Sequence, residues 1–262
     1  LAAMLRHKTG PLLVALQVAL SLAILCNAML MISERLSMAA RPSGIADEQD
    51  VFYVHVSNQK VDGHEAQLAM QKQEEQTMLA VPGVVTVESL LRDAIYPVHA
   101  DGNTGEKITL RAMPADTAMF SPRMVAGRWL QPGDTNSVVL STNITRKEPT
   151  YTVGQTVTMR IHDQDYQFHI IGYIEELQPP VNPALAYMTI DGYNVVAGSV
   201  GRTDTVRVSS TAHDAATHKT LSIALEQALT AAGYDVRLIH TRTEDRTILA
   251  DRFNLISVVL SI

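Results

Sequence analysis

Two groups of histidine and aspartate residues are the parts of this chain whose types could support metal binding or proton transfer. The first group is His162, Asp163, Asp165 and His169, and the second is His213, Asp214 and His218. We expect the first group to lie on a β-hairpin with its turn at residues 163–165. The second is expected on a helix, where the two histidines are five residues apart and diverge, while Asp214 and His218 could pair. Neither group offers the ligand number and spacing of a metal site, so the sequence predicts none.

Other catalytic signatures are missing from the sequence. It contains no Gly-x-x-x-x-Gly-Lys-Ser/Thr loop, so the chain is not itself an ATPase, and no Gly-x-Ser-x-Gly nucleophile elbow. The single cysteine, Cys26, lies in an apolar segment, and the pair Glu175-Glu176 beside Pro179-Pro180 is expected in a solvated loop. We therefore predict no catalytic residues, no cofactor and no enzymatic activity. A formal net charge of −6 without a basic stripe also argues against nucleic-acid binding.

The N-terminal region has the pattern of a membrane span. Residues 12–32 carry no charge, and 21 residues at about 1.5 Å each cover about 32 Å, close to the hydrocarbon thickness of a bilayer. Arg6 and Lys8 flank this span, so the positive-inside rule places residues 1–11 in the cytoplasm and everything after Ser33 outside it. The alternative is a cleaved signal peptide with its cleavage site at residues 37–39, although the apolar part of a signal peptide is usually only about 7 to 15 residues long.

The C-terminal region ends in a second, shorter apolar run. Residues 255–262 are too few to cross a bilayer, and the chain begins with Leu1 in place of an initiator Met. We expect a fragment that ends in the start of a second span; a buried C-terminal core helix is the alternative. Thr241 and Glu244 form a capping pair that predicts a stalk helix over residues 241–254. A first stalk is expected at residues 33–50, directly after the first span.

Two segments between the apolar ends share one layout. In each, a short strand is followed by a helix and a second strand; the strands are expected at residues 51–56, 84–87, 205–208 and 236–239. Asp62 with Glu65 and Thr211 with Asp214 are expected to cap the two helices, and Gly83 and Gly233 to follow their ends. This order predicts two β-α-β units with parallel strands that share one sheet, with the helices on one face.

The region between these units has the pattern of short strands separated by turn residues. The strands are expected at residues 107–112, 137–142, 156–162, 166–171 and 185–190. The predicted fold class is therefore a membrane-anchored α+β protein. Its α/β layer, residues 51–94 and 202–240, is interrupted by an inserted, mostly β lobe at residues 95–201.

The inserted lobe also contains short phrases in a characteristic order. Ala126-Gly127-Arg128-Trp129-Leu130 is followed by Asp134 and the strand 138–141, then by Val153-Gly154-Gln155-Thr156-Val157 and by a strand that reaches Gly172. In this order they resemble the periplasmic core domain of MacB-type (FtsX-like) ABC transporter permeases. The motif residues are expected to be structural: glycines at turns or close approaches, Arg128 paired with Asp134, and Trp129 at the core or rim of the lobe.

The resemblance implies a function in transport. It implies a porter-like subdomain from the α/β layer and a sabre-like subdomain from the β lobe, in a bacterial inner membrane with the main domain in the periplasm. It also implies an ATP-binding cassette ATPase partner, a permease homodimer or heterodimer, and a possible periplasmic adaptor protein. The family's uses include efflux of peptides or small molecules, lipoprotein extraction and control of cell-wall hydrolases. Two alternatives stay open: a sensor module of a two-span receptor, and a membrane-anchored periplasmic enzyme or binding protein.

Overall fold

The computed structural model describes residues 9–39, 44–45, 48–57, 64–175, 183–197, 203–211, 213–241 and 244. The chain divides into two units: one contains the N-terminal helix, and the other is the domain between Pro42 and Arg246. The predictions for Arg6, for Lys8, for the cap at Asp62 and for residues 245–262 lie outside the described residues.

The N-terminal unit contains one long helix, α1, over Thr9–Ala39. Its stretch Gly10–Glu34 is long and apolar enough to cross a membrane, with a mean hydropathy of 2.2. The apolar side chains of that stretch are exposed all round the helix, which suits a lipid environment. The helix continues past the predicted span, so the first residues of the predicted stalk are helical.

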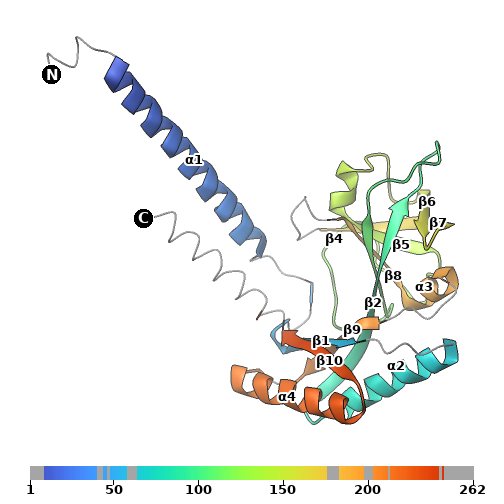
Figure 1. Cartoon of the computed structure of the whole chain (residues 1–262). Coiled ribbons are helices and arrows are strands. Elements are labelled where there is room, and N and C mark those ends of the chain that lie inside the picture. The colour runs from blue at the N-terminus through green and yellow to red at the C-terminus, as the bar shows by residue number, and fades with distance from the viewer. Residues whose placement is uncertain are drawn as a thin grey trace. The chain divides into compact units, whose positions relative to one another are not determined.

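The first half of the domain is a four-stranded sheet in the order β10-β1-β9-β2. Its strands are β1 (Val51–Ser57), β2 (Val84–Pro97), β9 (Thr203–Ser210) and β10 (Asp235–Thr241). Every neighbouring pair is antiparallel, so β1 runs parallel to β2, and β9 to β10, with one strand of the other unit between them. Helices α2 (His64–Leu79) and α4 (Ala215–Ala231) lie along this sheet (Figure 1). The predicted β-α-β units are present, interleaved as in a ferredoxin-like split β-α-β arrangement.

The alternation of apolar residues along the strands and the helical spacing of leucines in α4 explain how this half of the domain packs. Phe52 and Val54 of β1 point to the same face as Val208 of β9, and they form one buried cluster with Leu225 and Leu229 of α4. Their neighbours on each strand therefore point to the opposite face.

The predicted cap of α4 is shifted by three residues. Asp214 is itself the N-cap, and its carboxylate accepts hydrogen bonds from the backbone N–H groups of Ala216 and Thr217. Thr211 instead donates its backbone N–H to the carbonyl of Gly83, so the predicted capping box at Thr211 is wrong. An aspartate bonds well to the N–H groups of the first turn, and here it is the residue placed directly before the helix.

The second half of the domain is a β-rich lobe inserted between β2 and β9. Its strands are β3 (Ile108–Met113), β4 (Met124–Gly127), β5 (Ser137–Ser141), β6 (Thr156–Ile161), β7 (Gln164–Ile174) and β8 (Leu185–Thr189). The pairings β2-β3, β3-β8, β8-β5, β5-β7, β7-β6 and β6-β2 close a ring. The second part of β2 therefore forms a small barrel with β3, β5, β6, β7 and β8, while β4 lies at the side of β7. Strand β4 and helix α3 (Ile190–Ala197) were not predicted from the sequence.

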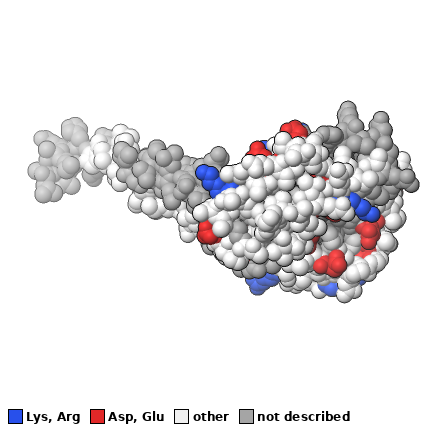
Figure 2. Space-filling model, turned by 90° about the horizontal axis from the view of Figure 1, so that it is seen from below, with Lys and Arg blue, Asp and Glu red and all other residues white. Residues whose placement is uncertain are grey.

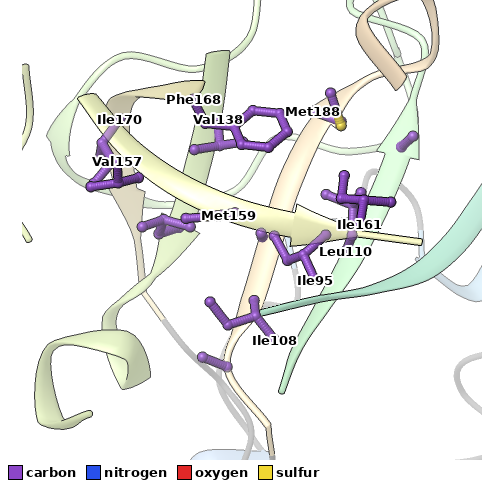
Figure 3. Packing of buried hydrophobic residues seen from close by; sticks show 14 of the residues in the cluster. Ile95, Ile108, Leu110, Val138, Val157, Met159, Ile161, Phe168, Ile170 and Met188 are labelled. Atoms are coloured by element: carbon purple, nitrogen blue, oxygen red, sulfur yellow. The ribbon is translucent and has the colours of Figure 1, made fainter. Parts of the chain in front are cut away.

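Alternate residues of the barrel strands fill its interior (Figure 3). Large buried side chains come from all sides of the ring, among them Ile95, Ile108, Leu140, Met159 and Phe168. Because a closed barrel has few free strand edges, this lobe is stabilised by its own core and needs no covering helices.

Strand β2 is far longer than predicted and belongs to both halves. Its first part, Val84 to Leu91, pairs with β9, and its second part, from Leu91, pairs with β3 and then with β6. It therefore crosses the predicted lobe boundary between residues 94 and 95. The two halves of the domain share one continuous strand.

The hairpin between β6 and β7 also differs from the prediction. Its turn is formed by His162 and Asp163, which have φ values of 47° and 63°, and Asp165 lies within β7. His162 is therefore a turn residue and does not lie on a strand. Two residues at positive φ match the right-handed twist of the flanking strands, as in a type I′ turn.

Candidate functional site

The motif residues Gly127 and Gly172 lie where β4 passes very close to β7. The backbone N–H of Arg128 donates to the carbonyl of Ile171 at 3.0 Å. A Cβ atom on Gly127 would lie 2.2 Å from that carbonyl oxygen, and one on Gly172 would lie 2.4 Å from the Arg128 oxygen. Gly127 also has φ +69°. Both positions require glycine for close backbone approach.

Arg128 and Asp134 form a two-point ion pair that closes the turn after β4. The Nη1 and Nη2 atoms of Arg128 lie 2.7 and 2.9 Å from the two carboxylate oxygens. Asp134 also accepts the backbone N–H of Gln131 at 2.8 Å. The hydrogen bonds from Arg128 lower the pKa of Asp134, and the carboxylate raises the pKa of Arg128. The pair is partly exposed, and its role is to fix a turn.

Gly154 binds the same part of β7 through its backbone. Its N–H donates to the carbonyl of Ile170 at 2.8 Å, next to the carbonyl that binds Arg128, but a Cβ at Gly154 would meet nothing within 4 Å. The structure thus gathers the motif residues around residues 170–172 of β7.

Trp129 extends the motif towards the interior of the domain. Its ring lies 5.4 Å from that of Phe120 and 5.4 Å from that of Tyr187, measured between centroids. Its indole Nε1 is buried and has no hydrogen-bond partner among the residues that the structure describes. Phe120, Trp129 and Tyr187 form an aromatic group. It connects residues 127–134, which we call the motif turn, with a buried ionic cluster of Glu88, Arg111 and Arg207, which we call the junction.

The centre of the junction is an ion pair between Glu88 on β2 and Arg207 on β9. These residues are opposite each other in the sheet, on the face away from α2 and α4. Arg207 Nη2 lies 2.9 Å from Glu88 Oε2, and their side chains are only 3% and 8% exposed. Glu88 also accepts the Thr117 hydroxyl at 2.6 Å and the Ala118 backbone N–H at 3.2 Å. A loop of the barrel half is thereby bound to the sheet of the other half.

A second guanidinium, that of Arg111, lies near the Glu88–Arg207 pair. Burial lowers the pKa of Arg207; the Glu88 carboxylate opposes this shift and the nearby guanidinium of Arg111 adds to it. Arg111 lies 5.9 Å from the ring centroid of Tyr187 and donates to the Tyr187 hydroxyl at 3.4 Å. Among the described residues, no hydrogen-bond acceptor reaches the buried Nε group of either arginine.

The residues first considered for chemistry are dispersed over the domain. In the first group, His162 pairs with Asp93 of β2 at 2.9 Å, and Asp165 pairs with Arg160 at 2.6 Å. His169 lies elsewhere, with its Nδ1 3.3 Å from the Thr156 hydroxyl.

The second group is divided in the same way. His213 precedes α4, so the prediction that it lies on the helix is wrong, and its Nδ1 lies 2.9 Å from Asp50. The carboxylate of Asp214 caps α4, and His218 packs edge-on against Phe52. Across the described parts of the chain, no three potential metal-ligating side chains come together.

The remaining acidic candidate is the pair Glu175-Glu176. Glu175 lies 3.1 Å from Arg123 across the ends of β4 and β7. Glu176 and Pro179-Pro180 lie outside the described residues. On the face seen in Figure 2, the charged side chains stand apart and both signs occur, without a continuous basic surface among the residues described there.

Sequence reasoning missed the junction. Arg207 was read only as part of a short strand, Glu88 lay just beyond a predicted one, and Phe120 and Thr117 were assigned no role. The available signal was a charged residue inside an apolar strand, Val206-Arg207-Val208. That signal is weak because one face of an antiparallel sheet is commonly solvated.

The fold and these contacts define a class: an α+β domain with an inserted barrel, preceded by an apolar helix long enough to span a membrane. Comparison with protein families gives a match to the MacB-like periplasmic core domain over residues 13–228. Because this match covers most of the sequence, the chain belongs to the MacB-like periplasmic core domain family of ABC transporter permeases, as the order of its motifs predicted.

Solved structures similar to this chain include two from transporters. One is the periplasmic region of MacB from Actinobacillus actinomycetemcomitans, with 12% identity, coverage of 81% of this chain and 97% of that chain, and a TM-score of 0.49. The other is the extracellular domain of the noncanonic ABC-type transporter YknZ from Gram-positive bacteria, with 14% identity, coverage of 71% and 100%, and a TM-score of 0.48. Comparison with curated proteins gave no match.

Proposed function

We propose that this chain is the first span and extracytoplasmic domain of a permease subunit that couples cytoplasmic ATP hydrolysis to a conformational change of the domain. The observation that carries the proposal is the family match, which begins inside α1 and continues through both halves of the domain to α4. The subunit is non-catalytic, and a separate ATP-binding cassette protein or domain hydrolyses ATP.

The position of the two ends of the domain supports this proposal. Phe52, near the start of β1, is the direct cross-strand partner of Thr241, at the end of β10. The start of the first strand and the end of the last strand are therefore neighbours, about 5 Å apart between Cα atoms in an antiparallel pair. Movement of the connection that follows β10 would act on this pair of strands.

The residues after β10 support a helical second connection. The backbone N–H of Thr241 donates to the Glu244 carboxylate at 2.7 Å, and the backbone N–H of Glu244 lies 3.2 Å from the Thr241 hydroxyl. This reciprocal pair is a capping box, the arrangement that satisfies the first backbone N–H groups of a helix. We propose that a stalk helix follows and that it leads to a second span.

The proposal includes the remaining features that the family resemblance implies. Residues 1–11, with Arg6 and Lys8, lie in the cytoplasm, and the domain lies in the periplasm beyond a bacterial inner membrane. Residues 51–94 and 202–240 form the porter-like subdomain, residues 95–201 the sabre-like subdomain, and two permease subunits assemble with the ATPase and a periplasmic adaptor. The transported load is a peptide or small molecule in efflux, or a lipoprotein in extraction.

The test is made on the complete permease, purified in detergent from its own host membranes. We expect an ATP-binding cassette protein to co-purify and hydrolyse ATP. A spin label is placed on the exposed helix face at Lys219→Cys, in a Cys26→Ser background. Distances between the labels of two subunits should change with ATP and orthovanadate and remain unchanged with ADP.

Two results would contradict the proposal. One is an active ATPase complex whose label distances ignore nucleotide. The other is a permease that co-purifies with a kinase or a methyl-accepting protein and lacks an ATPase, which would identify a sensor.

A further inference from the structure

The barrel half sends one loop, residues 114–123, to two places that are far apart in the sequence. At its inner contact, Thr117 and Ala118 bind the buried carboxylate of Glu88. At its outer contact, the backbone N–H of Ser121 donates to the carbonyl of Gly44 at 2.6 Å. We call residues 114–123 the coupling loop.

The outer contact is made by the segment that follows α1. Ile45 forms an antiparallel bridge with Phe120, and Gly44 has φ +77°. A Cβ atom on Gly44 would lie 2.9 Å from the Cα of Pro122, so the two backbones are packed directly against each other. Only four residues separate Gly44 from Ala39, the last residue of α1, so the Cα atoms of Ala39 and Gly44 can be at most about 18 Å apart. A movement of α1 that would carry Ala39 farther than this from Gly44 must therefore pull on Gly44.

The inner contact is suited to rearrangement. Phe120 lies over Arg207, with 5.9 Å between the guanidinium carbon and the ring centroid, in the same short loop that binds Gly44. Among the described residues, no acceptor reaches the buried Nε groups of Arg111 and Arg207 or the Nε1 of Trp129. Each of these donors can gain a hydrogen bond from water when the junction opens, and this gain opposes the cost of separating the ion pair.

We propose that the coupling loop transmits displacement of the segment after α1 to the Glu88–Arg207 pair, and so controls how firmly the two halves of the domain are held together. When Gly44 holds the loop, Thr117 and Ala118 complete the coordination of Glu88 and the junction stays closed. When Gly44 is pulled away, the loop leaves Glu88 and the junction opens. This inference rests on the proposed function for the source of the pull, but the contact itself is testable without nucleotide.

The first experiment is hydrogen exchange of the complete permease in lipid nanodiscs, with Gly44→Ala compared with Gly102→Ala. Both glycines have positive φ, +77° and +82°, but a Cβ at Gly102 would meet nothing within 4 Å. We expect Gly44→Ala to increase exchange about tenfold at the amides of Ser121 and Ala118, with a smaller rise at the strand amides flanking Glu88 and Arg207. The Gly102→Ala variant should leave these amides unchanged.

Thr117→Val provides a second, milder variant that keeps the fold if Gly44→Ala does not. It removes the hydroxyl that binds Glu88 and accepts from the Met119 N–H. Exchange at Ser121 should rise although Thr117 does not touch Gly44, and the effects of the two substitutions should be non-additive. A rise confined to each mutated contact would overturn the proposal, because it would show that the two ends of the loop act independently.

Nucleotide then separates this inference from the proposed function. With the ATPase bound, ATP and orthovanadate should change exchange at Ser121 and Ala118 relative to ADP. If no part of the domain responds to nucleotide but the Gly44→Ala effect persists, the loop couples the two contacts and the ATP-driven function is wrong. If the domain responds while Ser121 and Ala118 do not, the coupling loop is wrong and the function stands.

Discussion

The motif turn and the junction each contain an arginine–carboxylate pair, and they differ in how the sequence and the fold create that pair. Arg128 and Asp134 are six residues apart and partly exposed, whereas Glu88 and Arg207 are 119 residues apart and almost fully buried. Water and salt screen the first pair, so it adds little stability beyond fixing a turn. The second pair is shielded from water, so removing either partner would leave the other as an uncompensated buried charge.

This difference also separates two functions of charged residues. The motif turn fixes the chain that follows β4 against β7. The junction binds two halves of the domain through buried contacts. The following changes test that distinction, beginning with the largest expected effect.

Glu88→Ala should lower the free energy of unfolding by about 3–5 kcal/mol, because Arg207 would remain as a buried, unpaired charge. Unfolding of residues 1–262 in detergent can be followed by the fluorescence of Trp129, the only tryptophan in this sequence, which lies beside the junction. The double variant Glu88→Leu with Arg207→Met should recover most of the loss. Equal instability of the single and double variants would show that packing, and not charge pairing, holds the junction.

Glu74 tests a buried carboxylate whose pKa is raised by burial. Burial, with a smaller contribution from Glu75, raises the pKa of Glu74 on α2 to about 7 from a model-peptide value of 4.5. The folded state therefore holds the proton more tightly, so the free energy of unfolding should fall by up to about 3 kcal/mol as pH rises from about 4.5 to 7.

The control for this pH dependence is on the neighbouring helix. Glu74→Gln should remove the fall between these pH values, whereas Glu226→Gln at an exposed position of α4 should retain it. The measurement is the urea midpoint across pH 4–8. An unchanged slope in Glu74→Gln would assign the dependence to other groups.

Gly127→Ala should destabilise the domain by about 2–3 kcal/mol, because its Cβ would collide with the carbonyl of Ile171 and its φ is positive. Gly154→Ala is the matched control, with φ +91° and open space around the new methyl group, and should cost about 1 kcal/mol. Thermal unfolding of the two variants measures the difference. Equal losses would mean that backbone conformation, and not close approach, makes Gly127 necessary.

Arg128→Ala should cost least, about 0.5–1 kcal/mol, because the pair is partly exposed. The loss should shrink at high salt, where exposed charges are screened. Glu88→Ala should keep its full effect in the same salt series. A large, salt-independent loss in Arg128→Ala would place the motif turn in the same class as the junction.

Features written in local patterns could be predicted. Alternation of apolar residues placed most strands within a few residues, and the interval between leucines predicted α4 and its end near Gly233. The family followed from short phrases in a fixed order. The errors came where several local choices compete: either Thr211 or Asp214 could cap α4, and His162 could end a strand or begin a turn.

The junction and the coupling loop could not be predicted in this way. Glu88 and Arg207 meet because β2 continues past its predicted end and β9 inserts between β1 and β2. Gly44 and Ser121 meet because the barrel closes and turns the loop after β3 towards the segment that follows α1. Neither event leaves a periodic signal in the sequence.

The sequence by itself determined the apolar helix, the order of most strands and helices, and the glycines of the motif turn, because each depends on side chains within a few residues of one another. Only the tertiary structure decided which face of each strand is buried against another part of the domain. Burial converts Glu88 and Arg207 from ordinary surface residue types into a pair on which two halves of the domain depend, since the strength of a charge interaction is set by the water that the fold excludes.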